Sequence, residues 1–188
     1  MPVVVHAYRD ENPPHADAAA EYARVVQSII DVLQSDARAT PERIAVMTGL
    51  DVRAVREQVE AWEREGVIRR YKAVIDPERL RALTGAEVVT ALIDVSVAPE
   101  RGVGFDGVAA RIARFSEVRS VCLVSGGQDL RCEVTGQSMA QIADFVARKL
   151  ATIDRVRSTA THFVMKAYKA DGELFLPATE DHRLTVAP

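Results

Sequence analysis

The stretch that decides the fold runs from Thr40 to Ile75 and reads TPERIAVMTGLDVRAVREQVEAWEREGVIRRYKAVI. Thr40 before Pro41 predicts the start of a helix, because threonine caps exposed N–H groups and proline at the first helical position loses no hydrogen bond. Gly49 predicts a tight turn, since glycine tolerates positive φ. Asp51 predicts the cap of a second helix. Two helices joined by such a turn form a helix-turn-helix.

Apolar spacing predicts which sides of these helices are buried. The expected inward residues are Ile44, Ala45 and Met47 in the first helix and Val52, Val55, Val59 and Trp62 in the second. Gly66 predicts the end of the second helix, and alternation over Val67 to Ile75 predicts a short β pair, or wing. A further helix from Asp17 supplies the third wall, with its apolar side at Tyr22, Val25, Val26, Ile29, Ile30 and Leu33. These elements predict a winged helix-turn-helix, whose second helix most often enters a DNA major groove.

Composition and charge limit the class of protein. The chain has 188 residues, of which 48% are hydrophobic and 27% charged, enough for two small domains. Apolar runs stay well below the roughly 18 residues of a membrane span, and the first residues do not read as a secretory signal. We therefore expect a cytoplasmic protein without a membrane partner. The net charge of −3 means that DNA binding depends on a local basic patch.

The second half of the chain predicts the order β-α-β-β-α-β, the ferredoxin-like split unit. The expected elements are strands at Val88–Val97, Val118–Val124, Leu130–Val134 and Val156–Tyr168, with helices at Asp106–Phe115 and after Ser138. The second helix is expected to bury Met139, Ile142, Phe145, Val146 and Leu150. Helices then cover one face of a four-stranded antiparallel sheet. The other face is expected to be partly apolar and to be covered by a second copy, as in a dimeric α/β barrel.

The domain boundaries follow from these patterns and place the whole chain in the α+β class. We expect an N-terminal extension at 1–16, the winged helix-turn-helix at 17–76, a linker at 77–86, the ferredoxin-like domain at 87–176 and a tail at 177–188. The linker is expected because Asp76-Pro77 and Thr84-Gly85 interrupt regular structure.

Three motifs in this order resemble the Lrp/AsnC family of bacterial and archaeal transcription regulators. They are Trp62-Glu63-Arg64-Glu65-Gly66-Val67-Ile68, then Tyr71-Lys72-Ala73-Val74-Ile75-Asp76-Pro77, then Leu123 to Leu130 (LVSGGQDL). The resemblance covers roughly Ala23 to Phe175. It implies a regulator that binds double-stranded DNA and forms homodimers, often octamers, through its C-terminal domains (RAM domains). It also implies a small effector, usually an amino acid, bound between these domains, and no enzymatic activity, metal or cofactor.

Carried over residue by residue, the family's effector motif falls on Ser125, Gly126, Gly127, Gln128 and Asp129. Two glycines leave backbone N–H groups uncovered for a carboxylate, and an aspartate can accept from an ammonium group. The alternative is an ordinary hairpin turn in which Gly-Gly supplies positive φ. Thr159 and Thr161 are candidate second-side contacts, although threonine is also common in strands for its β-propensity alone.

The predicted reading helix departs from the family pattern. Between Asp51 and Glu65 it carries three arginines against five acidic residues, a net charge of −2. DNA phosphates repel such acids. The candidate DNA contacts are Arg53 and Arg56 for base edges and Arg43, Arg69, Arg70 and Lys72 for the backbone.

Two other functions remain open from the residues alone. The helix-turn-helix could serve only assembly, in a ligand-sensing protein that does not bind DNA. Sirohaem decarboxylases resemble the same two-domain architecture, and a tetrapyrrole enzyme would depend on His162 and a nearby arginine such as Arg157. The two cysteines, Cys122 and Cys132, are expected to be small buried hydrophobic residues.

Overall fold

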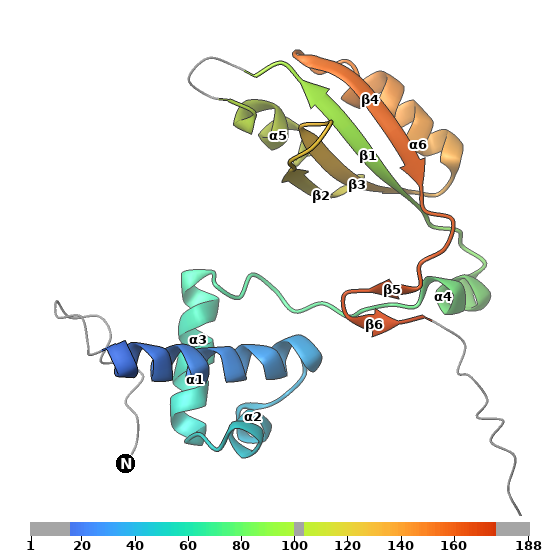
Figure 1. Ribbon diagram of the computed structural model, residues 1–188. Helices are drawn as coiled ribbons and strands as arrows, with labels where there is room; N and C mark the ends of the chain where they lie inside the picture. Colours follow the sequence, from blue (N-terminus) through green and yellow to red (C-terminus); the bar gives the residue numbers. More distant parts are fainter. Residues whose placement is uncertain (1–15, 100–103, 176–188) are drawn as a thin grey trace, which may run out of the picture. The chain divides into compact units, whose positions relative to one another are not determined.

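Figure 1 shows the computed structural model, which describes residues 16–99 and 104–175. The chain divides into two compact units, Met1–Ala73 and Val74–Pro188. The predicted tail at 177–188 and all of the predicted extension except Ala16 lie outside the described residues. None of the helices in the described ranges combines the length and the apolar character that a membrane crossing requires.

The first unit is a three-helix domain with the predicted helix-turn-helix. It consists of α1 (Ala16–Ser35), α2 (Pro41–Thr48) and α3 (Val52–Glu65). The Thr40 hydroxyl accepts from the Arg43 N–H at 3.4 Å, and the Asp51 carboxylate accepts from the Ala54 N–H at 3.0 Å. Both caps are therefore confirmed. Gly49 has φ of 73°, which reverses the chain between α2 and α3 at no steric cost.

The core of this domain confirms most of the apolar pattern. It is formed by Ile29, Val32, Ile44, Ala45, Val55 and Trp62. Met47 was expected in this core, but 57% of its surface is exposed. Helix α2 has only two turns, and Ile44 and Ala45 occupy its packed side, so that its last turn remains outside the core. Val52 at the start of α3 is also exposed rather than inward.

The predicted wing is absent. Residues 69–76 form neither helix nor strand, and all of them except Asp76 are exposed. A strand pair needs a turn between its strands, yet Val67 to Ile75 contains no glycine, proline, asparagine or aspartate to reverse the chain. The alternating pattern thus describes a single extended segment, which has no partner strand among the described residues.

The segment that was expected to interrupt regular structure holds a helix, α4 (Pro77–Thr84). Asp76 accepts from the N–H groups of Glu78 and Arg79, and Pro77 occupies the first helical position. Gly85, with φ of 68°, ends the helix. Asp-Pro here starts a helix, as Thr40-Pro41 does earlier in the chain.

The second unit has the predicted β-α-β-β-α-β order (Figure 1). Its elements are β1 (Val89–Val97), α5 (Asp106–Ile112), β2 (Val118–Leu123), β3 (Leu130–Gly136), α6 (Met139–Phe145) with a π-helical continuation η1 (Val146–Leu150), and β4 (Val156–Phe163). The sheet is antiparallel with strand order β2-β3-β1-β4. After β4, which ends five residues earlier than expected, a small hairpin forms from β5 (Lys169–Ala170) and β6 (Glu173–Leu174).

Helices α5 and α6 cover one face of the sheet and form a continuous core with it. The buried residues are Ala91, Ile93, Val95, Val97, Val108, Ile112, Leu130, Cys132, Val134, Ile142, Phe145, Leu150 and Ile153. Gly136 permits this packing, because a Cβ there would lie 3.0 Å from Ile142 Cγ1. Met139, expected in the buried stripe, is 49% exposed on the first turn of α6.

The second face of the sheet is more polar than expected. Along β1 it carries Thr90, Leu92, Asp94 and Ser96, which alternate with the buried residues. The strands beside β1 add charged and polar side chains in register with these, namely Arg131, Glu133, Ser158 and His162. Leu92 is thus a lone large aliphatic residue among polar neighbours on the described part of β1. We call this surface the open face, since no described helix covers it.

The cysteines differ, contrary to the prediction that both are buried. Cys132 lies on the helix-covered face with no exposed surface, whereas Cys122 is exposed and pairs in register with Arg131 on the open face. Burial raises the pKa of the Cys132 thiol to about 11. The two residues are ten apart, and the β2–β3 turn places them on opposite faces.

In dilute folded protein at about pH 8, we expect a thiol reagent to label Cys122 and to spare Cys132, because thiolate is the reactive form. Mass spectrometry after a short exposure would give one label per chain, and two in denaturant. The Cys122→Ser variant should give none when folded. Equal labelling rates for both thiols in folded wild type would contradict the assignment of faces.

Candidate functional sites

The exposed side of α3 carries both arginines that were predicted to reach bases, and each is paired with an acid. Arg53 Nε lies 2.8 Å from Glu57 Oε1, one turn further along the same helix. Arg56 pairs with Glu42 of α2. The hydrogen bond to Glu57, and then the negative charge of Glu57, raise the pKa of Arg53. The helix therefore presents ion pairs rather than bare cations.

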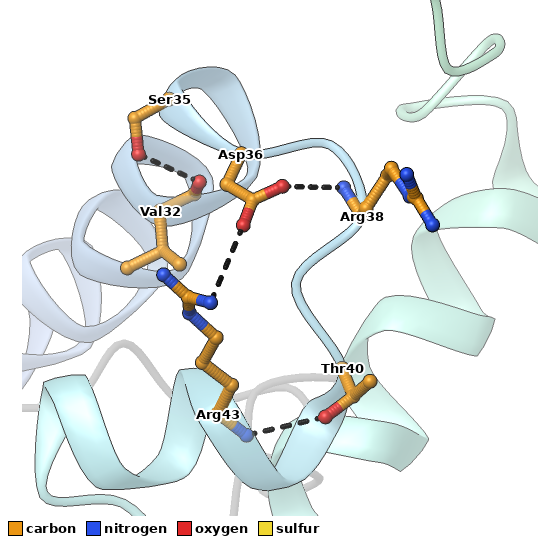
Figure 2. Close-up of polar contacts among 6 residues, drawn as sticks. All are labelled: Val32, Ser35, Asp36, Arg38, Thr40 and Arg43. Atoms are coloured by element: carbon orange, nitrogen blue, oxygen red, sulfur yellow. Dashed lines mark hydrogen bonds and ion pairs between the residues drawn. The ribbon is translucent and has the colours of Figure 1, made fainter.

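Arg43 of α2 pairs with Asp36, which lies in the connector between α1 and α2 (Figure 2). Asp36 accepts from the Arg38 N–H at 3.0 Å, and its other oxygen lies 3.8 Å from Arg43 Nη1. The Arg38 side chain points away from Asp36 (Figure 2). Arg43 is thus exposed, and it lies on α2 rather than on the reading helix α3. Such a position suits a contact with the DNA backbone rather than with base edges.

The other three predicted DNA contacts, Arg69, Arg70 and Lys72, lie on the extended segment after α3, and all are exposed. Tyr71 anchors this segment, because its hydroxyl donates to Glu63 Oε1 of α3 at 2.9 Å. Partial burial, and then this hydrogen bond, raises the pKa of Tyr71. Arg70 and Lys72 therefore lie on either side of Tyr71, the residue that attaches this segment to α3.

The predicted effector residues form one turn between β2 and β3. The Val124 N–H donates to the Asp129 carbonyl at 2.9 Å, which closes the turn. Gly126 has φ of 138°, whereas Gly127 does not have positive φ, and a Cβ at either position would meet no atom within 4 Å. Only one of the two glycines is therefore needed for the backbone conformation, and the surroundings of both are open.

The Asp129 carboxylate holds this turn to the end of β1. Its Oδ2 accepts from the Val97 N–H at 2.8 Å and lies 3.4 Å from the Ser96 hydroxyl. The Asp129 N–H donates to the Val95 carbonyl at 3.2 Å. This carboxylate therefore has an anchoring role that the sequence did not indicate.

Gln128 provides the unusual feature of the turn. Its side-chain Oε1 is buried and has no hydrogen-bond partner among the described residues. Buried acceptors are nearly always satisfied in native proteins, because an unpaired one costs about 1–3 kcal/mol. The turn thus contains an acceptor that lacks a donor.

Thr159 and Thr161 lie on β4, half-buried on the helix-covered side of the sheet, where they pair with Val95 and Ile93. Val95 also pairs with Leu130, at the end of the effector turn. Strand β1 therefore separates the threonines from the turn by about 10 Å within one chain.

A charged cluster at the centre of the open face was not identified from the sequence. Arg131 of β3 donates to both oxygens of Asp94, at 2.7 and 3.0 Å, and His162 Nε2 lies 3.6 Å from Asp94 Oδ2. The hydrogen bonds from Arg131, and then its charge, hold the pKa of Asp94 below its ordinary value. The strand register would have indicated this cluster, because it places Asp94 directly opposite Arg131. His162, on which the enzyme alternative depended, belongs to this cluster.

A capped helix-turn-helix followed by a ferredoxin-like domain with a glycine-containing β2–β3 turn is typical of a two-domain DNA-binding regulator. Residues 25–69 match the family model for a winged helix-turn-helix DNA-binding domain, and residues 90–174 match that for the Lrp/AsnC ligand binding domain. The chain belongs to the Lrp/AsnC family of transcription regulators. It is 48% identical over 160 residues to the HTH-type transcriptional regulator YugG of Bacillus subtilis, covering 85% of this chain and 95% of that protein.

Further relatives agree. The chain is 30% identical to the HTH-type transcriptional regulator LrpA of Pyrococcus abyssi, over 75% of this chain and 94% of that one. Among solved structures, it is similar to the leucine response regulatory protein LrpA of Mycobacterium tuberculosis, with TM-score 0.63, 26% identity and coverage of 79% and 96%. It is equally similar to a feast or famine regulatory protein of the same organism complexed with L-methionine, with TM-score 0.63, 26% identity and coverage of 80% and 96%. These relatives are transcription regulators, and the resemblance to the family is confirmed.

Proposed function

We propose that this regulator binds specific DNA sequences through α3 and is controlled by an amino acid bound at the β2–β3 turn. The observation that carries the effector site is the buried Gln128 Oε1, which has no donor within the described part of the chain. An ammonium group is a strong donor for such an acceptor, since charged hydrogen bonds are worth about 1.5–3 kcal/mol. Gly126 and Gly127 are exposed and have open space where a Cβ would lie, so their backbone N–H groups suit the carboxylate of the same molecule.

The complex of a related regulator with L-methionine supports this class of ligand. Asp129, which was expected to accept the ammonium group, is assigned a different part here. Its Oδ2 is engaged with β1, so it fixes the turn while Gln128 provides the unpaired acceptor. Ser125 is exposed at the start of the turn. Within one chain, Thr159 and Thr161 are too far from the turn to contact an effector bound there. They would contact it only if the ligand extends across β1 or if a second copy places its threonines beside the turn.

DNA contact is assigned to the exposed side of α3 and the segment that follows it. Arg53 and Arg56 lie on the first turns of α3, the part of a reading helix that meets base edges. Arg43 on α2 and the exposed Arg69, Arg70 and Lys72 after α3 would add positive charge for phosphates. The paired acids reduce this charge, so we expect a modest salt dependence.

We propose that the protein forms a homodimer through the open face of the sheet. The open face of the sheet holds Asp94 nearly buried, with 8% of its surface exposed, together with the apolar Leu92. A second copy laid on this face would cover Leu92 and complete the desolvation of the Asp94–Arg131 pair. Two copies related by a twofold axis would present two α3 helices to a roughly palindromic site. Effector and DNA would then alter each other's affinity by the same factor.

Gln128→Leu tests the effector site, because it removes the unpaired acceptor and keeps the volume of the side chain. We expect the affinity for L-methionine, measured by isothermal titration calorimetry, to fall about tenfold or more. Thermal stability should stay the same or rise, since a buried unsatisfied atom disappears.

Gln128→Glu is the matched control, because it retains an acceptor at the same position and should retain binding. Other amino acids should be titrated in parallel to establish which side chain the wild type prefers. An unchanged affinity in Gln128→Leu would remove this residue from the site. Failure of the wild type to bind any amino acid would contradict the effector proposal itself.

A further inference from the structure

We propose that Arg53 and Glu57 act together as one reading unit that recognises a single guanine–cytosine pair in the major groove. This inference rests on the proposed role of α3 as the reading helix. It assigns Glu57, which lies among the acids that appeared only to oppose DNA binding, a positive part in specificity. It also assigns the base pair that the helix requires.

The geometry of the ion pair leaves the right groups exposed. Arg53 uses Nε to hold Glu57 Oε1 at 2.8 Å. Its two Nη groups and Glu57 Oε2 have no partner among the described residues. The side chains are 87% and 57% exposed, so both can reach a ligand. The pair therefore presents two donors beside one acceptor.

This pattern is the complement of one base-pair edge. In the major groove, guanine presents N7 and O6 as acceptors and its cytosine presents the N4 amino group as a donor. An adenine–thymine pair has a donor between two acceptors and cannot satisfy the same three groups. Arginine donating to guanine and a carboxylate accepting from cytosine are both favourable contacts.

Glu57 differs from the other acids on or near the start of α3 in the group that it contacts. The Asp51 carboxylate caps the helix by accepting from the Ala54 N–H. Glu42 belongs to α2 and pairs with Arg56. Glu60 lies one turn further along, where it faces Arg64 at 4.0 Å. Glu57 is thus the acid on the early turns of α3 that accepts a hydrogen bond from an arginine of the same helix.

Holding Glu57 beside Arg53 also reduces the cost of bringing a carboxylate to DNA. A lone acid would be repelled by the phosphates, whereas the pair carries no net charge. The i, i+4 spacing fixes both side chains on one side of the helix before DNA arrives. The unit therefore contributes selectivity more than overall affinity.

The test begins with selection of bound duplexes from a pool with a randomised segment of roughly 30 base pairs, enough for two half-sites one helical turn apart. We expect one guanine–cytosine pair in each half-site to be required, with about tenfold weaker binding when it is replaced. Arg53→Ala and Glu57→Ala should each lose this requirement while the other positions keep theirs. The Glu60→Gln and Arg64→Ala variants are matched controls, because they remove the next i, i+4 pair, and they should keep it.

Modified bases then separate the two partners. Replacing the required guanine by 7-deazaguanine removes N7 and should weaken wild-type binding several-fold but leave Arg53→Ala unaffected. Inosine retains N7 and O6 and lacks only a minor-groove group, so it should be tolerated. Circular dichroism would verify that each variant is folded, which the exposure of both side chains favours.

Three results would overturn the inference. The first is a wild type that requires no guanine–cytosine pair. The second is that Arg53→Ala and Glu57→Ala keep the requirement. The third is that Glu57→Ala tightens binding to all sequences equally, which would mean that Glu57 only repels phosphates. If wild type selects no sequence at any salt concentration, the assignment of α3 as the reading helix fails as well, so the two failures are distinguishable.

Discussion

Replacing Leu92 with arginine is expected to separate the protein into monomers and to weaken its affinity for a duplex with two half-sites by about two to four orders of magnitude. Leu92 lies at the centre of the open face, in register with Glu133 on one side and His162 on the other. The subunit should tolerate arginine there, because Glu133 can pair with it. A second copy could not, because the new charge would be buried against its sheet. In a dimer, binding of one DNA-binding domain raises the effective concentration of the other at the second half-site. This gain is lost when the dimer separates.

Light scattering would give the mass, and fluorescence anisotropy with a duplex selected by the wild type would give the affinity. Met139→Arg is the control, because Met139 is exposed on α6, on the helix-covered side of the sheet. It should leave both quantities unchanged. Cys122, on the open face, should react with thiol reagents faster in Leu92→Arg than in wild type. A Leu92→Arg protein with the wild-type mass would show that the copies associate through another surface.

Replacing Trp62 with alanine is expected to cost about 3–5 kcal/mol of folding free energy in the helix-turn-helix domain. Trp62 is 5% exposed and packs in a core that contains Ile29, Ile44 and Val55. A domain of this size has little stability in reserve, so the loss should leave it largely unfolded. DNA binding should disappear while the ferredoxin-like domain and its oligomeric state persist.

Urea titration followed by far-ultraviolet circular dichroism would measure the loss, because the helices of the first unit dominate that signal. Trp62 is the single tryptophan of the chain, so fluorescence would not serve both proteins. Trp62→Phe retains most of the buried surface and should have a smaller effect. Unchanged unfolding of Trp62→Ala would mean that this core is not what holds α3 in place.

The sequence predicted those parts of the fold that depend on local chemistry. Helix caps at Thr40 and Asp51 and the glycine ends at Gly49 and Gly66 require particular side chains, and the structure confirms all four. Strand alternation along β1 was equally informative, since one face of the sheet is packed. The expected wing failed because alternation alone cannot supply a partner strand. The unforeseen helix α4 shows that Asp-Pro has two meanings, a break and a cap, which only the following residues distinguish.

The candidate sites were only partly predictable. The turn at Ser125–Asp129 was located correctly as a turn, because glycines mark the reversal between β2 and β3. The anchoring of Asp129 to Val97 was not foreseen, since it joins residues that are 32 positions apart. The ion pairs Arg56–Glu42 and Arg131–Asp94 were not predicted, for the same reason. Long-range partners depend on register and helix packing, which no single stretch of sequence specifies.

Helix α4 buries none of its residues and is held by the Asp76 cap, by Gly85 and by local bonds such as that from the Thr84 hydroxyl to the Leu80 carbonyl. Its amide protons should therefore exchange with solvent early, because opening it exposes no apolar core. Eight residues span about 12 Å as a helix and about 26 Å when extended. Melting this one element would more than double the length of this segment, and in the proposed dimer we expect the added length to help the protein accommodate half-sites at unequal separations.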